Sequence, residues 1–178
     1  MRPAEPTIRT AEVSDGPSIW HLVKRSPGLD LNSPYCYLLL CSHFCETCLV
    51  AESEGALNGF VTAYVPPGRP DTIFLWQIAV EAESKGRGLG RRLVDTLLDR
   101  LPEEIAFLEA TVTPANTASR SLFQAVARDK GTSLTESAFF GPELFPPGGS
   151  DPSGHEPELL IRVGPMAEME EMNRTSNR

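Results

Sequence analysis

The sequence has no excess of basic residues. Its 178 residues include 24 Asp and Glu against 16 Lys and Arg, so the formal net charge is -8. Because nucleic-acid binding needs a basic surface that neutralises phosphates, this balance argues against a nucleic-acid-binding protein. A small cationic substrate suits an acidic protein better.

Long apolar runs are also missing. No stretch approaches the roughly 18 apolar residues that a membrane span needs, and the first eight residues lack the apolar core of a signal peptide. We therefore expect a cytoplasmic protein that does not bind membranes. The length and the 40% hydrophobic content fit one globular domain, placed at residues 1–165, while the charged tail 166–178 is expected to be disordered.

Cysteine is scarce and confined to one segment. The four cysteines lie between Cys36 and Cys48, where Cys45-x-x-Cys48 next to His43 invites a zinc or redox interpretation. A structural zinc site normally takes a second pair of ligands from a separate loop, and the sequence offers no such pair. We therefore expect no metal, and interpret the cysteines as small, partly buried thiols in a reducing compartment.

The pattern of apolar and turn-forming residues predicts ten elements in the order β-α-α-β-β-β-α-β-α-β. The strands are expected at 7–11, 48–52, 57–64, 72–80, 106–113 and 158–163. The helices are expected after the Ser14-Asp15 cap, at 35–40, from 89 to 101 and at 116–128. Residues 141–154, which are rich in Gly and Pro, are expected to form a loop.

A glycine-rich turn lies between a predicted strand and the helix that follows it, in the sequence Lys85-Gly86-Arg87-Gly88-Leu89-Gly90. The glycines allow a tight turn, and the free amides and dipole of a helix N-terminus favour a bound diphosphate. Lys85, Arg87, Arg91 and Arg92 add positive charge. The turn is neither a Walker A motif nor a dinucleotide-binding G-x-G-x-x-G, so ATP and NAD are disfavoured. A plain tight connection is the simpler alternative.

This turn resembles the acetyl-CoA signature of GNAT acetyltransferases, [Gln/Arg]-x-x-Gly-x-[Gly/Ala], with Lys85 at the first position. Residues 113–123 resemble the family's Asn-x-x-Ala-x-x-Leu-[Tyr/Phe] segment. The resemblance implies an α+β GNAT fold, with a central mixed, mostly antiparallel β-sheet that is flanked by helices and splayed between strands 4 and 5. It also implies acetyl-CoA as co-substrate, bound by Ile78, Ala79, Val80, Lys85, Gly86, Arg87, Gly88, Gly90, Arg91 and Asn116.

Two of these positions have other interpretations or departures from the family. Asn116 could serve only as the cap of the helix that follows. Many relatives carry a Tyr as general acid for the departing thiolate where this chain has Phe123. Since Phe cannot donate a proton, water or another residue must protonate a thiolate whose pKa is about 8.5.

Three longer strings, at 30–39, 74–80 and 155–165, resemble the diaminobutyrate acetyltransferases of ectoine biosynthesis. That resemblance implies acetyl transfer to the 4-amino group of L-2,4-diaminobutyrate by a homodimer. The residues expected to bind the substrate are Asp30, Asn32, Ser33, Tyr35, Trp76, Glu156 and Glu158. If 155–163 is a strand, Glu156 and Glu158 share one face.

Acetyl transfer needs a neutral amine, although a free alkylamine has a pKa of about 10, so the site must remove a proton. Glu156 and Glu158 are the leading candidates for this base, followed by Asp30, and His155 is also possible. Backbone N–H groups near Ile78–Val80 would stabilise the oxyanion. Each acid and His155 also has a purely structural alternative, as a cap, a solvated charge or a packed ring.

Three other functions stay open at this point. The first is a GNAT enzyme for another small diamine or a polyamine, which would not need carboxylate-binding donors near Asn32 and Tyr35. The second is an acetyl-CoA-binding regulatory module without turnover, which Phe123 mildly favours. The third is a zinc-binding interaction domain.

Overall fold

The structure is a computed structural model that describes residues 5–145 and 155–166. The chain divides into two compact units, the first comprising Met1–Tyr64 and Leu75–Leu101 and the second Val65–Phe74 and Pro102–Arg178. The boundary falls inside strand β4, Thr72–Val80. The assignment of residues 1–165 to one catalytic domain stays a prediction.

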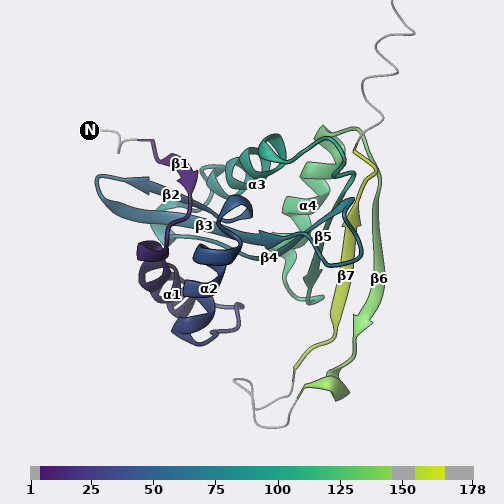
Figure 1. Cartoon of the computed structure of the whole chain (residues 1–178). Coiled ribbons are helices and arrows are strands. Elements are labelled where there is room, and N and C mark those ends of the chain that lie inside the picture. The colour runs from purple at the N-terminus through teal and green to yellow at the C-terminus, as the bar shows by residue number, and fades with distance from the viewer. Residues whose placement is uncertain (1–4, 146–154, 167–178) are drawn as a thin grey trace, which may run out of the picture. The chain divides into compact units, whose positions relative to one another are not determined.

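The strands of the first unit follow one another in the order of the sequence (Figure 1). They are β1 (Thr7–Thr10), β2 (Leu49–Ser53), β3 (Ala56–Tyr64) and the Leu75–Val80 part of β4. The β1–β2 and β2–β3 pairs are antiparallel. The predicted Glu54-Gly55 hairpin turn is confirmed, and both of its residues have positive φ, 52° and 76°, as two-residue hairpin loops with right-handed twist prefer.

Helices cover both faces of these strands. They are α1 (Gly16–Arg25), α2 (Pro34–His43) and α3 (Leu89–Arg100). Figure 1 shows α1 and α2 on one side of β2 and β3 and α3 on the other. Adjacent residues of β3 explain this arrangement, because a Cβ on Gly59 would come within 3.3 Å of Leu93 of α3, whereas the Phe60 ring lies in the core cluster with α1 and α2.

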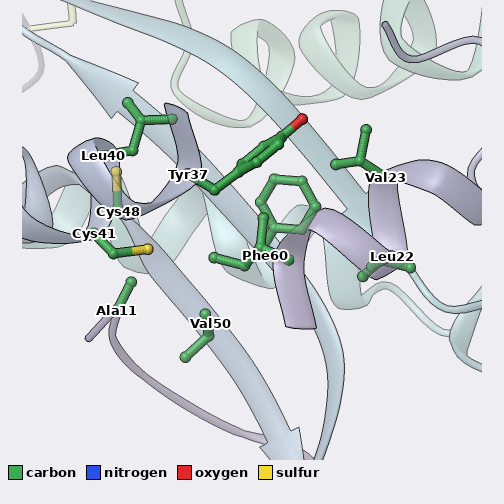
Figure 2. Close-up of a cluster of buried hydrophobic side chains, with 10 residues drawn as sticks. Ala11, Leu22, Val23, Tyr37, Leu40, Cys41, Cys48, Val50 and Phe60 are labelled. Atoms are coloured by element: carbon green, nitrogen blue, oxygen red, sulfur yellow. The ribbon is translucent and has the colours of Figure 1, made fainter. Parts of the chain in front are cut away.

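That core cluster includes two of the four cysteines. Cys41 and Cys48 are 2% and 0% exposed, and Figure 2 shows them beside Leu40 and Val50. Burial raises the pKa of Cys41 to about 12 and that of Cys48 to about 11. The interpretation of these thiols as buried core groups is therefore confirmed. Within residues 5–145 and 155–166, no group of three or more potential metal-ligating side chains is assembled.

The second unit contains the mixed part of the sheet. Its strands, in the order β4-β5-β7-β6, are the Thr72–Phe74 part of β4, β5 (Phe107–Val112), β7 (Glu158–Val163) and β6 (Leu134–Phe140). The β4–β5 pair is parallel, and the β5–β7 and β6–β7 pairs are antiparallel. Helix α4 (Thr117–Asp129) contacts β6 and β7. The predicted mixed, mostly antiparallel sheet with flanking helices is confirmed.

Several local predictions need correction. Strand β6 was not predicted, whereas the strand expected at 158–163 is confirmed as β7 and does not extend back to residue 155. Asp15 occupies the N-cap position of α1, but its carboxylate accepts hydrogen bonds from Arg9 and from the Glu12 N–H instead of capping the helix. A short 3-10 turn, Pro142–Leu144, lies in the predicted 141–154 loop. The rest of that loop from residue 146, and the predicted disordered tail from residue 167, lie outside the described residues.

None of the helices that the structure describes is both long enough and apolar enough to cross a bilayer.

Candidate active site

The glycine-rich turn leads directly into helix α3. Gly88 is the N-cap of this helix, with φ 76° and ψ 5°, and no side chain caps the helix start. Because Gly88 has no side chain to cap the helix, the start of α3 is suited to binding an anion through its backbone N–H groups. A Cβ on Gly88 would meet no heavy atom within 4 Å, and one on Gly90 would meet only Val80 Cγ1 at 4.0 Å. The turn thus leaves open space for a phosphate close to the backbone.

The basic side chains around the turn differ in their surroundings. Lys85 and Arg87 are exposed. Arg91 donates from Nε to both carboxylate oxygens of Asp95, at 2.9 Å each, and Arg92 pairs with Glu5 at 2.8 Å. Arg91 is thus oriented by an acid one helical turn further on. Lys85 and Arg87 remain the exposed side-chain cations of the turn itself.

Backbone contacts hold the 29–33 segment, which carries three predicted substrate-binding residues. The Asp30 carbonyl accepts from Gln77 Nε2 at 2.8 Å, and the Asn32 carbonyl accepts from Trp20 Nε1 at 3.1 Å. Asp30 and Ser33 are exposed, and the Ser33 hydroxyl makes no cap to α2 although Ser33 is its N-cap residue. These backbone bonds leave the side chains of Asp30 and Ser33 at the surface of the first unit.

Two aromatic residues near this segment were also predicted to bind substrate. Tyr35 is 66% exposed at the first turn of α2. Trp76 is half-buried on β4, packs against the core cluster and stacks on Tyr37 with ring centroids 6.4 Å apart. Trp76 therefore combines the two interpretations, because part of its surface belongs to the core and part is exposed.

Tyr37 and Gln77 bond the 29–33 segment, although neither was singled out from the sequence. The Tyr37 hydroxyl donates to Gln77 Oε1 at 3.1 Å and accepts from the Asn32 N–H at 3.4 Å. Burial raises the pKa of Tyr37, against the opposing effect of its hydrogen bonds. Their contact spans 40 residues of sequence, so no local motif could have revealed it.

The second unit carries the remaining candidates. Asn116 caps α4, because its side-chain oxygen accepts from the Ser119 N–H at 3.1 Å. Glu156, in the coil before β7, accepts from the Ala115 N–H at 3.3 Å. The structure therefore brings Glu156 to the turn that precedes α4. Because Glu156 lies outside the strand, the expected shared strand face with Glu158 is not formed.

His155 is held in a defined orientation. Its ring stacks on Phe145 with centroids 3.6 Å apart, and its Nδ1 lies 2.6 Å from the carbonyl oxygen of Glu156. A carbonyl can only accept, so Nδ1 carries a proton and a neutral His155 has its lone pair on Nε2.

Phe123, where many GNAT enzymes have Tyr, is only 1% exposed in α4. Its side chain therefore packs in the interior, and this position offers no hydroxyl to protonate the departing thiolate.

A buried carboxylate in the second unit was also missed. Glu109 on β5 is 1% exposed and accepts from Arg69 at 2.7 Å and from Arg162, whose guanidinium lies over the Phe107 ring at 3.6 Å. Two cations compensate this buried charge, as burial of an ionised group requires. We interpret the cluster as structural, since it ties β5 to β7 and to the loop before β4.

The chain is similar to known acetyltransferases both in sequence and in fold. The model of the acetyltransferase (GNAT) family matches residues 17–127. The L-2,4-diaminobutyric acid acetyltransferase of Marinococcus halophilus is 46% identical over 86% of both chains, and that of Streptomyces coelicolor is 42% identical over 92% of this chain and 95% of its own.

Solved structures agree. The diaminobutyrate acetyltransferase of Paenibacillus lautus, in complex with L-2,4-diaminobutyric acid and coenzyme A, superposes with a TM-score of 0.86 at 39% identity, covering 91% of this chain and 96% of the other. The ribosomal-protein-S18-alanine N-acetyltransferase of Escherichia coli, at 21% identity and a TM-score of 0.65 over 90% of this chain and 94% of the other, shares the fold alone.

Proposed function

The chain belongs to the acetyltransferase (GNAT) family, and from this premise we propose that it transfers the acetyl group of acetyl-CoA to the 4-amino group of L-2,4-diaminobutyrate. The product is N4-acetyl-L-2,4-diaminobutyrate, an intermediate of ectoine biosynthesis. The observation that carries this function is the match over nearly the whole chain to the Paenibacillus lautus enzyme, which holds both diaminobutyric acid and coenzyme A.

The glycine turn fits a pyrophosphate group of acetyl-CoA. Its backbone is accessible at Gly88 and Gly90, the helix start of α3 supplies N–H donors, and Lys85 and Arg87 supply exposed positive charge. Acetyl-CoA supplies the activated acetyl group. The N–H groups of Ile78–Val80, at the end of β4 that leads toward this turn, are proposed to polarise the thioester carbonyl.

The amine substrate carries two ammonium groups and one carboxylate at neutral pH. Asp30 is proposed to bind an ammonium group, while Asn32, Ser33 and Tyr35 offer donors to the carboxylate. Trp76 contributes an apolar wall, since this residue is only partly buried although it also packs against the core cluster.

The reaction also needs an acceptor for the proton of the reacting ammonium. We assign this role to Glu156 or Glu158, and His155 is the alternative acceptor because its Nε2 carries the lone pair in the neutral ring. The Ala115 N–H that Glu156 accepts orients this carboxylate and ties it to the turn before Asn116. Asn116, although its side chain caps α4, stays a candidate for contact with acetyl-CoA.

The protein is further proposed to act as a homodimer in the cytoplasm. Strand β6 pairs with β7, six of its seven residues are exposed, and they include Phe139 and Phe140 at 44% and 43%. An exposed strand with two aromatic residues calls for a cover, and a second copy of the chain would provide one. Four free cysteines fit a reducing compartment.

An assay of thiol release tests the substrate assignment. With acetyl-CoA at saturation, diaminobutyrate, ornithine, lysine and putrescine are compared in parallel, and diaminobutyrate is expected to have the highest kcat/KM. A higher kcat/KM for putrescine would show that the preferred substrate is an amine without a carboxylate and not a diamino acid. If none of the four amines caused thiol release, the assignment as an enzyme would be contradicted.

A further inference from the structure

Three hydrogen bonds, which all run from donor to acceptor in the same direction, form a relay that joins Asn32 to Asp30 through side chains of α2 and β4. The Asn32 N–H donates to the Tyr37 oxygen at 3.4 Å, the Tyr37 hydroxyl donates to Gln77 Oε1 at 3.1 Å, and Gln77 Nε2 donates to the Asp30 carbonyl at 2.8 Å. We propose that Tyr37 and Gln77 are positioning residues that set the Asp30–Ser33 segment for the amine substrate. This proposal rests on the proposed function.

The polarity of this relay can be deduced from its ends. A backbone N–H such as that of Asn32 can only donate, and a carbonyl such as that of Asp30 can only accept. A hydroxyl and a primary amide between them satisfy both ends in one way, with the amide oxygen toward Tyr37 and the amide nitrogen toward Asp30. A carboxylate at position 77 has no proton for the carbonyl, and a Phe at position 37 has none for the amide.

The side chains that form the relay are buried, whereas the segment that they hold is exposed. Tyr37 and Gln77 are 0% and 5% exposed, whereas Asp30 and Ser33 are exposed. Figure 2 shows the Tyr37 ring among buried side chains, with its hydroxyl pointing away from Cys41 and Cys48. The core therefore fixes the ring, and the ring fixes the position of its hydroxyl.

Other contacts complete the clamp on the same segment. The Asn32 carbonyl accepts from Trp20, and Asn32 Nδ2 donates to the Asp30 carbonyl at 3.3 Å. The backbone on both sides of Leu31 is thus held by three different elements of the first unit. Because a misplacement of about 1 Å in a binding group can cost about a hundredfold in rate, such a clamp has a function beyond stability.

Near-isosteric substitutions test the proposal. Tyr37→Phe removes only the hydroxyl, and Gln77→Glu replaces the donor to the Asp30 carbonyl with a carboxylate oxygen. Each is expected to raise KM for diaminobutyrate roughly tenfold while KM for acetyl-CoA stays within about twofold of the parent. The double variant is expected to match the worse single variant, because either change interrupts the same relay.

Thr62→Val is the matched control. Thr62 is fully buried on β3, and its hydroxyl bonds the backbone of Gln77 at 3.2 and 3.3 Å, whereas the relay uses the side-chain amide of Gln77. It should lower the melting temperature but leave KM for diaminobutyrate at the parental value. Comparison at equal folded fraction separates positioning from general destabilisation.

The outcomes distinguish this proposal from the function on which it rests. If the parent protein releases no thiol with diaminobutyrate, the proposed function fails. If the parent is active and folded Tyr37→Phe and Gln77→Glu keep parental KM for the amine, the relay is structural only and the positioning proposal is wrong.

Discussion

The sharpest prediction concerns Gly88, whose backbone conformation and open surroundings are both required by the proposed phosphate site. Its φ is 76°, and a Cβ would meet no heavy atom within 4 Å. Gly88→Ala therefore adds backbone strain of about 1–2 kcal/mol without a steric clash inside the protein. At roughly 2–4 °C per kcal/mol for a chain of this size, the melting temperature should fall by about 2–8 °C.

Binding of acetyl-CoA should suffer separately from this strain. The added methyl group occupies the space in which a phosphate oxygen approaches the first N–H groups of α3. We expect the Kd for acetyl-CoA, measured by isothermal titration calorimetry, to rise at least about tenfold, which corresponds to about 1.4 kcal/mol.

Gly55 supplies a matched control in the same unit. It has the same φ of 76°, and a Cβ there also meets nothing within 4 Å, but it lies in the β2–β3 hairpin turn. Gly55→Ala should lower the melting temperature by a similar amount and leave the Kd for acetyl-CoA unchanged. Parental affinity in folded Gly88→Ala, or equal loss of affinity in both variants, would refute the phosphate site.

Three further predictions address the amine site, α4 and the buried thiols. Asp30→Asn should raise KM for diaminobutyrate roughly tenfold through loss of a charged hydrogen bond, whereas Glu156→Gln or Glu158→Gln should lower kcat in at least one case. Parental steady-state kinetics in all three variants would show that the substrate pocket is placed in the wrong part of the molecule. Phe123→Tyr should leave kcat within about tenfold of the parent. It should also lower the free energy of unfolding by about 1–3 kcal/mol in thermal melts, because it buries a hydroxyl in the core. A larger rise in kcat would show that protonation of the thiolate limits the rate of the parent. Burial raises the pKa of Cys41 to about 12 and that of Cys48 to about 11 from an ordinary 9.0. As the pH rises, the unfolded chain loses these protons before the folded chain does, so the melting temperature should fall above about pH 9 and should fall less in the double Ala variant. An identical pH dependence of the melting temperature in the two proteins would contradict this.

Local chemistry explains what could be predicted from the sequence. The glycine turn places its glycines, its charges and the start of α3 within a few adjacent residues, so the sequence alone predicts a helix N-terminus open to an anion. The Glu54-Gly55 hairpin has the same short range. The buried cysteines were predicted from the absence of a second ligand pair, and the core around Cys41 and Cys48 confirms it.

Long-range pairing explains what was missed. Strand β6 is exposed along nearly its whole length, so it has no buried alternating face, and its order comes from pairing with β7, for instance Ser137 with Leu160. Gln77 reaches Asp30 across 47 residues, and the Arg69–Glu109 pair spans 40. No periodicity within a window of sequence encodes such contacts.

The position of the acetyl group on the product tests the central claim most directly. Parent protein is incubated with L-2,4-diaminobutyrate and acetyl-CoA labelled with carbon-13 in the acetyl group, and the acetylated nitrogen is identified by nuclear magnetic resonance. The account predicts a single product labelled at the 4-amino nitrogen. Acetylation of the 2-amino group, or no labelled diaminobutyrate at all, would contradict it.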